Sequence, residues 1–555
     1  MIISLNNCEK QKTKNILATV NNQEITITDF SDSYIQLILY GNAYDSRKTR
    51  LSHLNRIIDN YVFAQHGIKN NVVKAEQLKG IIKRSQREKT KELLLKEEIE
   101  DKVKPPTKND LKKLFHLKGQ KVRVKHLFTD TKKDIDSLYK LLQKEQSFDS
   151  IAFDLFRDSK LKNSGGDLGW KEFGELDPFL EDVAFNLKPD SFSKPVQSRF
   201  GWHILKIKNK TYQPLKSEYD FNTKKSDLKK QYIRREQNKR YYRYINNFME
   251  DKKAIIKNPE WSIVARELRK RFPQDKKLSP MLMQSPHSPE FGDMPPDIKD
   301  IKDNTIISFP EKNLTVAEFL ELVPSVPAKL VYRSIRQVTE RIIRDYFLVK
   351  EGQKRGLNNN ISVEQHATFR KNLKAGALYR NKLLQDNRVS PDSIDRVFVK
   401  AKYDSLKNSQ FIEQQTLDYS ILVAKDSLTR KKIDNFLQSG DFSDAIINYG
   451  LDKFGVLESG RFKKDRSEVP GIIRNKLLNL ADGHISSWMK INTKPVLLKR
   501  HSVNTEYKPF EDVKQKLLQR MSHNKSVAKV NKILSLWKED ADVKIYEERL
   551  YNLWG

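Results

Sequence analysis

The chain has 555 residues, which is too long for one hydrophobic core and predicts roughly three to five domains. Aromatic residues make up 10% of the sequence, which excludes wholesale disorder although 32% of the residues are charged and only 37% are hydrophobic. No apolar run approaches about 18 residues, so no transmembrane helix is expected.

The formal net charge is +32, which fits either a nucleic-acid partner or charge spread over solvated helix faces. The densest basic part, Lys224 to Arg243, has the pattern of a helix, and no compact basic block with interleaved aromatic residues stands out. We therefore expect solvated surface charge with a general attraction to acidic polypeptides and no specific nucleic-acid site. A basic nucleic-acid-binding or ribosome-associated factor is the less favoured alternative.

The predicted N-terminal tail, residues 1–18, contains Cys8, the single cysteine of the sequence. One cysteine forms neither an intramolecular disulfide nor a cysteine zinc site, and no other metal site is predicted. Leu5-Asn6-Asn7-Cys8 has the spacing of a bacterial lipobox, in which the cysteine carries lipid. Asn7 replaces the usual small residue, and no full charged and apolar leader precedes Cys8. The residue is therefore either a lipid attachment point or an incidental cysteine.

Residues 19–117 are predicted to be mainly helical. A short segment, Glu24 to Phe30, offers Thr28 and Asp29 as helix caps. Apolar residues then recur at helical spacing from Arg56 to Ile68, where Gly67 is suited to ending the helix.

Residues 118–212 contain two short alternating strands, each with a histidine. His126 lies in Val122–Phe128, and His203, much further along the chain, lies in Gly201–Ile207. Between them stands Gly165-Gly166-Asp167-Leu168-Gly169, whose glycines suit tight turns and lack the spacing of a phosphate-binding loop. In combination these motifs resemble a parvulin-type peptidyl-prolyl isomerase. The resemblance implies a small antiparallel sheet flanked by helices, and catalysed rotation about X-Pro bonds.

Prolyl isomerisation requires neither a nucleophile nor a cofactor. Its barrier of about 18–20 kcal/mol comes from amide resonance, so the catalyst must bind the twisted amide better than the planar forms. The resemblance implies that His126 and His203 lie side by side in a hydrogen-bond network under the substrate amide. It also places Asp158 where the family has Cys or Asp near that amide.

An apolar pocket should hold the proline ring. The resemblance assigns Leu168 and Leu176 to this pocket, and its aromatic position falls on Leu180, or on Phe179 if the register shifts by one residue. Phe200 is a further candidate for lining the site. Trp202 is expected to face the opposite side of its strand.

Residues 213–258 are predicted to form a long basic helix that runs into a short strand. Residues 259–304 are rich in prolines, which remove backbone donors and interrupt helices. We predict a linker or an extended arm for this region; the prolines that indicate it are Pro273, Pro280, Pro286, Pro289, Pro295 and Pro296.

The rest of the chain repeats this order. One and the same offset in numbering separates Phe30 from Phe319, Gly67 from Gly356, and Gly166 from Gly455. Residues 305–409 are predicted to be a second helical segment, in which Thr315 caps a helix. Residues 410–503 are a degenerate parvulin-like domain, and residues 504–555 are a second returning helix and strand. The sequence therefore predicts one internal duplication, whose two helical halves pack together.

The second parvulin-like domain lacks the polar residues of the first. Ser420 or Ile421 stands where His126 stood, and Val496 stands where His203 stood. His484 and His501 lie outside the expected strand positions and are interpreted as surface histidines. We expect an inactive parvulin fold that serves binding or spacing.

The chain thus shows the same order twice: a helical segment, an isomerase-like domain and a returning helix. This order resembles the SurA, PrsA and PpiD group of bacterial envelope foldases. The fold class expected is α+β. The resemblance implies a foldase and holdase for unfolded secreted or outer-membrane polypeptides in the periplasm, either soluble or anchored through lipid on Cys8. The alternative is a binding chaperone in which both parvulin domains are inert. The oligomeric state is left open.

Overall fold

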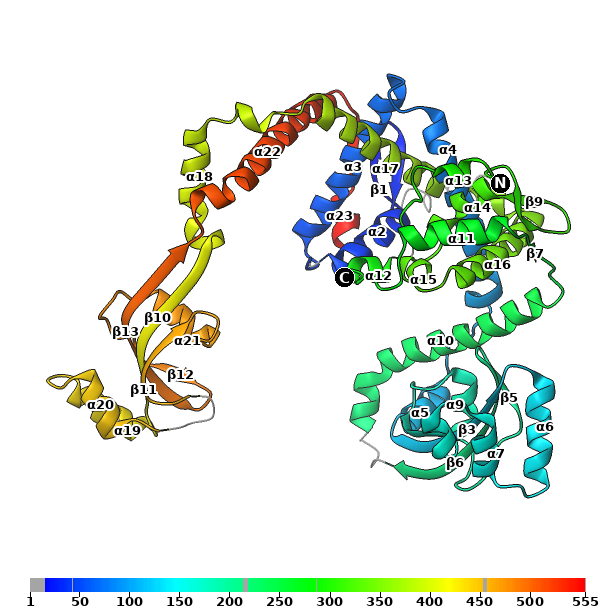
Figure 1. Cartoon of the computed structure of the whole chain (residues 1–555), viewed down its shortest axis with the longest axis horizontal. Helices are drawn as coiled ribbons and strands as arrows, with labels where there is room; N and C mark the ends of the chain where they lie inside the picture. Colours follow the sequence, from blue (N-terminus) through cyan, green and yellow to red (C-terminus); the bar gives the residue numbers. More distant parts are fainter. Residues whose placement is uncertain (1–14, 42, 213–217, 286, 453–456, 555) are drawn as a thin grey trace, which may run out of the picture. The chain divides into compact units, whose positions relative to one another are not determined.

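The computed structural model describes residues 15–41, 43–212, 218–285, 287–452 and 457–554. The chain divides into two compact units, the first made of Met1–Ala377 with Ala541–Gly555 and the second of Leu378–Asp540 (Figure 1). Helices and small antiparallel sheets make up both units, which confirms the α+β class. Within the described residues, no helix combines the length and the apolar character needed to cross a membrane.

The first helical segment begins with a β-hairpin and ends at the first sheet domain. Its elements are β1(Ile16–Val20), β2(Gln23–Thr26), α2(Ile27–Tyr40), α3(Arg47–Lys69), α4(Ala75–Leu95), the π-helical turn η1(Lys96–Glu100) and α5(Lys108–Leu117). The predicted tail thus ends inside β1, and Cys8 lies outside the described residues.

The helix caps correct one prediction and confirm another. Helix α2 begins after Thr26, which has extended backbone angles, and the Thr26 side chain accepts a hydrogen bond from the Asp29 amide at 3.2 Å. Thr28 and Asp29 therefore lie in the first turn and not at the cap. Thr315 does cap its helix, in a capping box with Glu318. Gly67 lies inside α3, so the prediction that it ends that helix is wrong.

The first sheet domain consists of β3(Gln120–Thr129), α6(Lys132–Gln143), α7(Phe148–Leu155), α8(Ser159–Asn163), β4(Asp167–Glu172), α9(Pro178–Ala184), β5(Val196–Ser198) and β6(Gly201–Tyr212). Its four-stranded antiparallel sheet has the order β4-β3-β6-β5 (Figure 1). One face packs on α9 through Val122, Val124, Leu205, Ile207 and Leu180. The other face packs on α6 and α7 through Leu127, Ile204, Ile135, Phe148 and Ile151.

The returning helix α10(Glu218–Met249) is followed by the strand β7(Ile255–Ile256), as predicted. Phe221 and Leu228 of α10 pack on Leu111 and Leu114 of α5, which precedes the sheet domain. The two helices that connect the sheet domain to the helical segment therefore pack on each other.

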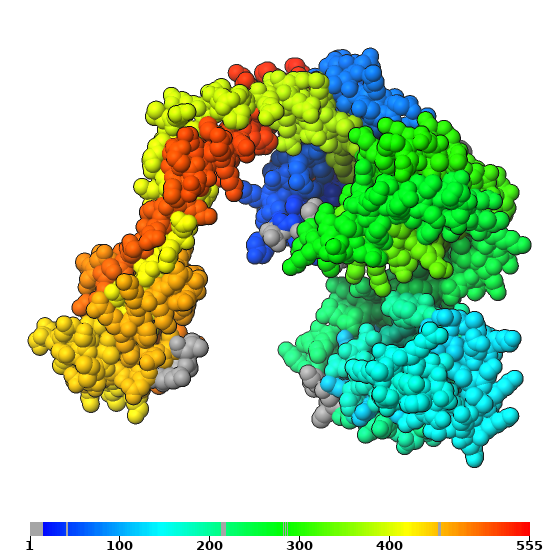
Figure 2. All heavy atoms as spheres, in the orientation of Figure 1, coloured from blue at the N-terminus to red at the C-terminus, as the bar shows by residue number. Residues whose placement is uncertain are grey.

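The proline-rich region is not an extended linker. It contains α11(Glu260–Arg271), α12(Pro280–Gln284) and α13(Pro296–Lys299), because Pro280 and Pro296 occupy first-turn positions where a missing amide costs nothing. Val264, Leu268, Phe272, Phe291 and Ile298 are buried in one cluster with the second helical segment. Figure 2 shows this region, in green, as part of the continuous surface of the helical body.

The second helical segment repeats the order of the first. Its elements are β8(Thr305–Ser308), β9(Asn313–Thr315), α14(Val316–Leu322), η2(Val323–Ser325), α15(Ala328–Arg333), α16(Ile335–Lys354), η3(Leu357–Asn359) and α17(Ile361–Asp386). Helix α16 packs against α4 of the first segment, and the ion pair Lys91–Asp345 at 2.6 Å joins them. The predicted packing of the two helical halves is confirmed.

Unit 2 contains the second sheet domain, with strand order β11-β10-β13-β12. The elements of unit 2 after α17 are η4(Pro391–Ser393), α18(Arg396–Gln410), β10(Ile412–Val423), α19(Ser427–Phe436), α20(Phe442–Tyr449), β11(Gly460–Asp465), α21(Gly471–Leu478), β12(Met489–Ile491), β13(Lys494–Tyr507) and α22(Phe510–Glu539). Strand β13 runs past the predicted boundary at residue 503. Val399 and Tyr403 of α18 pack on Val513 and Leu517 of α22.

Each helical half is completed by the last strand of the other half. Strand β14(Val543–Ile545), which precedes α23(Glu547–Tyr551), pairs with β1, and β7 pairs with β8. The two three-stranded sheets have the orders β14-β1-β2 and β7-β8-β9. The halves thus exchange strands within one chain.

The spacing of equivalent elements differs along the chain. Strands β1 and β8 begin at 16 and 305, and helices α2 and α14 begin at 27 and 316, so both pairs share the offset seen in the sequence. Strands β6 and β13 begin at 201 and 494, which is a slightly larger offset. Gly455 lies outside the described residues. The common origin of the halves stays a prediction.

Candidate active site

Two adjacent strands place His126 and His203 side by side. In the antiparallel pairing of β3 with β6, Phe128 lies opposite His203 and His126 lies opposite Leu205. Because side chains alternate along a strand, both histidines project from the face that packs on α9. Their ring centroids are 5.7 Å apart, and the rings are inclined by 25°. The structure therefore brings together the two histidines that the sequence singled out.

Phenylalanine rings flank the histidine pair on both sides. Phe156 stacks on His126 with a centroid distance of 5.3 Å, and Phe128 lies 5.0 Å from His203. Phe156 comes from the segment after α7, where the chain leaves the helix. Sequence reasoning missed both phenylalanines, although Phe128 stands two positions after His126 and so shares its side of the strand.

Ser198 holds the ring of His203. The Ser198 hydroxyl lies 2.9 Å from His203 Nε2 and accepts a hydrogen bond from the Phe200 amide at 3.0 Å. The tight turn between β5 and β6, which pairs Ser198 with Gly201, brings the hydroxyl back to the ring. The sequence analysis missed Ser198; the available signal was a polar residue at the start of the turn that leads into the second histidine strand.

Two ring nitrogens of this pair are buried without a partner. Among the described residues, no hydrogen bond reaches His126 Nε2 or His203 Nδ1. Burial lowers the pKa of His126 to about 4, and burial together with the neighbouring His126 ring lowers the pKa of His203 to about 4. Both rings are therefore neutral near pH 7. Because Ser198 engages His203 Nε2, the buried ring nitrogens left without a partner among the described residues are His126 Nε2 and His203 Nδ1.

The glycine motif forms the turn beneath His126. The His126 amide donates to the Gly166 carbonyl at 2.9 Å, and a Cβ atom at Gly166 would lie 2.2 Å from the His126 carbonyl oxygen. Gly166 has a φ of 76°, which also favours glycine. The Asp167 carboxylate accepts hydrogen bonds from Gly169 N and from the Arg123 side chain. The motif thus fixes the edge of the site, as its turn geometry predicted.

Asp158 caps the short helix α8. Its Oδ1 accepts a hydrogen bond from the Leu161 amide at 2.9 Å, and its side chain is exposed. Among the described residues, no hydrogen bond or ion pair joins the Asp158 side chain to either histidine. A role for Asp158 near the substrate amide stays a prediction.

Apolar residues cover the same sheet face as the histidines. Leu168 and Leu176 are partly buried against the cluster formed by Val122, Val124 and Leu205. Leu180 is itself a core residue with 5% exposure, whereas Phe179 is only half-buried. Phe179 is therefore the better pocket candidate of the two.

Two aromatic residues near His203 differ in orientation. Phe200 is 60% exposed at the turn before β6, where it can meet a substrate. Trp202 packs with Leu127 and Ile204 on the opposite face, as predicted.

Helix α10, which the sequence predicted as a separate segment after this domain, packs against α9. Arg235 forms ion pairs with Glu181 and Asp182 of α9 and donates to the Pro178 carbonyl. Further along the same helix, the Arg243 guanidinium lies 5.2 Å from the centre of the Phe179 ring. The returning helix therefore positions a cation over the candidate pocket aromatic.

The second sheet domain has no histidine pair at the equivalent positions. Strand pairing places Ile421 opposite Leu498 and Val423 opposite Val496, so Ile421 and not Ser420 corresponds to His126. Ile421 and Val496 are both buried in an apolar cluster with α21. His484 is exposed and lies 3.1 Å from the Asp482 carbonyl. His501, interpreted as a surface histidine outside the expected strand positions, is half-buried in β13, and its Nε2 atom lies 2.8 Å from the Ser420 hydroxyl.

The chain is similar to known proteins over the first sheet domain. Residues 117–209 match the family described as Rotamase: PPIC-type PPIASE domain. The segment is therefore a parvulin-type peptidyl-prolyl isomerase domain, which confirms the resemblance seen in the sequence.

Longer similarities are to foldases. Foldase protein PrsA of Clostridium botulinum (strain Okra / Type B1) is 30% identical over 152 residues, 27% of this chain and 44% of the relative. Foldase protein PrsA of Caldanaerobacter subterraneus subsp. tengcongensis is 25% identical over 247 residues, 38% of this chain and 80% of the relative. The chain thus spans less than half the length of the C. botulinum relative.

A solved structure of a SurA-like chaperone from Campylobacter jejuni, from work on PEB4 and the periplasmic protein Cj1289, is 20% identical. The similarity covers 44% of this chain and 100% of that one, with a TM-score of 0.17.

Proposed function

We propose that this protein is a peptidyl-prolyl cis-trans isomerase and foldase that acts on unfolded polypeptides. The observation that carries the proposal is the stacked, neutral pair His126 and His203 in a domain of the PPIC type. Helix α9, which packs on the same face of the sheet as the histidines, contributes the half-buried Phe179, and we propose that its ring holds the substrate proline.

Planar and twisted amides differ in how charge is distributed between the carbonyl oxygen and the proline nitrogen, and catalysis can exploit this difference. Twisting the X-Pro bond removes resonance, so the carbonyl oxygen loses charge and the proline nitrogen becomes a better acceptor. An apolar pocket that excludes water disfavours the charge-separated planar form. In the twisted form, an N–H group of a neutral imidazole can donate a hydrogen bond to the proline nitrogen. The buried nitrogens of His126 and His203 that have no partner among the described residues are available for that role.

The test measures cis-to-trans isomerisation of a proline tetrapeptide by the full chain. The full chain is required because α10 supplies Arg235 and Arg243 to the domain. We expect His126→Ala and His203→Ala each to lower kcat/KM at least about tenfold, which corresponds to about 1.4 kcal/mol of barrier. His116→Ala, which removes an exposed histidine at the end of α5, is the matched control and should leave the rate unchanged.

Circular dichroism of each variant separates lost catalysis from lost folding. A correctly folded His126→Ala variant with full activity would contradict the proposal. A wild-type chain without catalysis would leave a binding chaperone as the function, with both sheet domains inert.

A holding function belongs to the same proposal. The second sheet domain keeps the fold but has Ile421 and Val496 in place of the histidines, which suits binding or spacing better than catalysis. We place the protein in the bacterial cell envelope, with secreted or outer-membrane polypeptides as clients. Support comes from the similarity to PrsA foldases and from the net charge of +32, which would attract acidic chains. Attachment through lipid on Cys8 is part of the proposal and is tested by mass spectrometry of that residue.

A further inference from the structure

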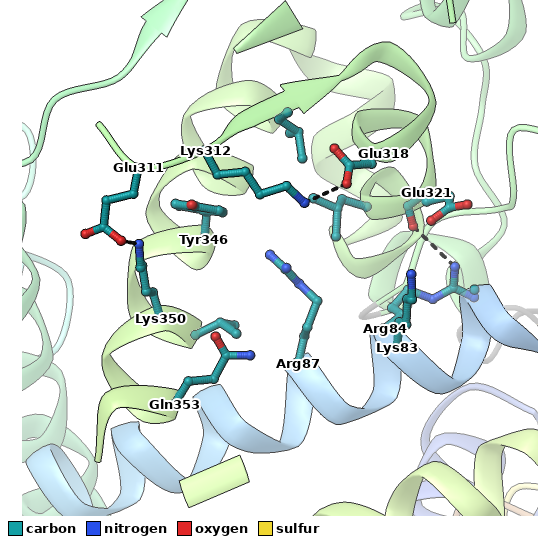
Figure 3. A pocket seen from close by; sticks show the side chains of 14 residues that line it. Lys83, Arg84, Arg87, Glu311, Lys312, Glu318, Glu321, Tyr346, Lys350 and Gln353 are labelled. Carbon is teal, nitrogen blue, oxygen red and sulfur yellow. Dashed lines mark hydrogen bonds and ion pairs between the residues drawn. The ribbon is translucent and has the colours of Figure 1, made fainter. Parts of the chain in front are cut away.

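A polar cavity lies in the helical body, built from elements of both halves of the chain (Figure 3). Its volume is about 400 Å³. Helix α4 forms one wall; the opposite wall comes from α16 and from the residues between Glu311 and Leu322. All of these residues belong to unit 1, and none of them is part of the isomerase site.

The lining carries more positive than negative charge. Five cationic side chains face three carboxylates, an excess of two positive charges. The cations are Lys83, Arg84, Arg87, Lys312 and Lys350, and the carboxylates are Glu311, Glu318 and Glu321.

Three of the cations already have protein partners. Lys312 donates to Glu318 at 2.7 Å, Lys350 pairs with Glu311, and Arg84 donates to the Glu321 carbonyl and lies 3.5 Å from Glu290. Within the part of the chain that the structure describes, no hydrogen bond or ion pair joins Lys83 or Arg87 to another residue. These two cations, one turn apart on α4, are available to a ligand.

Arg87 has the geometry of a ligand-binding residue. Figure 3 shows its side chain pointing from α4 into the middle of the cavity, toward Tyr346 and Glu318. The side chain is half-buried, and burial lowers the pKa of its guanidinium. The five N–H donors of the guanidinium are thus partly removed from water without a protein acceptor. This burial costs free energy unless an anion accepts their hydrogen bonds.

Apart from Gln353 and the Tyr346 hydroxyl, the rest of the lining is apolar. Leu314 and Val349 are buried, and Leu322 is half-buried. The Tyr346 ring stacks on Phe309 with a centroid distance of 3.8 Å. A small inorganic anion would leave this apolar surface in contact with water, whereas an acidic group with apolar neighbours would bury it.

We propose that this cavity binds a carboxylate of an extended polypeptide, with Arg87 as its bidentate partner and Lys83 as a second cation. The proposal rests on the proposed function, because it assumes that clients are unfolded polypeptides. A planar guanidinium matches a carboxylate with two parallel hydrogen bonds, and Lys83 adds a point charge. An Asp or Glu side chain and a free C-terminus offer the same chemistry.

Three labelled heptapeptides test the proposal by fluorescence anisotropy with the full chain. All have the sequence Ser-Gly-Leu-Xaa-Leu-Gly-Ser. The first has Glu at the centre and an amidated end, the second has Gln and an amidated end, and the third has Gln and a free C-terminal carboxylate. We expect at least one carboxylate peptide to bind about tenfold more tightly than the amidated Gln peptide, and its identity names the source of the carboxylate.

The variants assign that preference to the cavity. Arg87→Gln should abolish it, and Lys83→Gln, which alters an exposed side chain, should reduce it about threefold. The matched control is the double variant Lys79→Gln and Arg336→Gln, which removes two exposed charges from α4 and α16 outside the cavity and should keep the preference. Thermal melts of each variant check folding.

Equal affinity for the three peptides overturns the inference, and so does a preference that survives in correctly folded Arg87→Gln. Binding of inorganic phosphate that depends on Arg87, without binding of either carboxylate peptide, also overturns it. Isomerase activity measured in the same samples separates the two proposals. Absence of the carboxylate preference with intact catalysis refutes this inference alone, whereas absent catalysis refutes the isomerase function.

Discussion

Lys91 of α4 and Asp345 of α16 are 254 positions apart in the sequence, and their charged groups lie 2.6 Å apart. Their side chains are only 16% and 15% exposed. Arg344, at 2.7 Å, and Arg341, at 3.7 Å, also face the carboxylate. Burial opposes ionisation of Asp345, but the three cations outweigh it and hold the pKa of Asp345 below its usual value.

Replacing Asp345 by Asn should loosen the packing between the two halves. The change leaves three cations together without their carboxylate, and we expect the free energy of unfolding to fall by about 2–3 kcal/mol. Chemical denaturation of the full chain measures this. Glu340→Gln breaks the exposed pair with Arg336 on the same helix and should change the stability by less than about 0.5 kcal/mol. Equal effects of the two changes would contradict a special role for Asp345.

Acid should weaken the same contact. Because the folded pKa of Asp345 is depressed, its stabilising contribution is complete above the unfolded value near 3.9 and is lost as pH falls through the lower folded value. The stabilities of the wild type and of Asp345→Asn, measured by chemical denaturation, should therefore converge once the pH lies below the lowered folded pKa of Asp345. A difference that persists there would show that the carboxylate acts through packing and not through charge.

The isomerase should be insensitive to pH over the neutral range. His126 and His203 have pKa values lowered to about 4, so both rings stay neutral from pH 8 to about pH 5. We expect a flat kcat/KM profile over this range and a loss of rate below it. The folded state takes up these protons less readily than the unfolded state, so stability should decrease as the pH drops from about 6.5 to about 4. A rate that changes around pH 6.5 would contradict neutral, buried rings.

Gly376 is required where α17 crosses α3. A Cβ atom at this position would lie 2.2 Å from the Asn60 carbonyl oxygen, which is backbone and cannot rotate away. We expect Gly376→Ala to destabilise the helical body by at least about 2 kcal/mol in thermal or chemical denaturation. Gly80→Ala on α4 is the control, since no atom lies within 4 Å of its added Cβ and alanine favours the helix.

Phe179 should contribute to substrate binding. Phe179→Ala removes the half-buried aromatic ring under Arg243 and should raise KM about fivefold or more with little loss of stability. Leu180→Ala instead opens a cavity in the core and should cost about 2–4 kcal/mol of stability. Phe153→Ala, at a 48% exposed position on α7, should affect neither quantity. If Phe179→Ala leaves KM unchanged, another residue holds the proline ring.

The sequence predicted the features that local patterns encode. Residues close together in the sequence determine these features. They are the alternating strands around His126 and His203, the glycine turn, and the order of helices and strands. Thr315 was predicted as a cap from its residue type, and the structure adds its capping-box partner Glu318 three positions later. Thr26 was missed as the cap of α2, although its partner Asp29 stands at the same three-residue spacing.

Other errors involve contacts between residues that are distant in the sequence. The prolines of residues 259–304 indicated an open chain, but Val264, Leu268 and Phe272 find a buried surface on elements later in the sequence. Arg243 could not be assigned to the isomerase site because its contact with Phe179 depends on the direction in which α10 returns. Tertiary packing, and not local propensity, decides these cases.

The exchange of strands between the halves sets an order for biosynthesis. A chain that emerges from its N-terminus can form β7, β8 and β9 together while the remainder is still being made. The pairing of β1 with β14 must wait for Val543–Ile545, near the opposite end of the sequence. Until then Ile16–Val20 keeps an open edge that any extended polypeptide could occupy. Strand β1, the first strand of the part of the chain that the structure describes, is thus among the last to acquire all its neighbours.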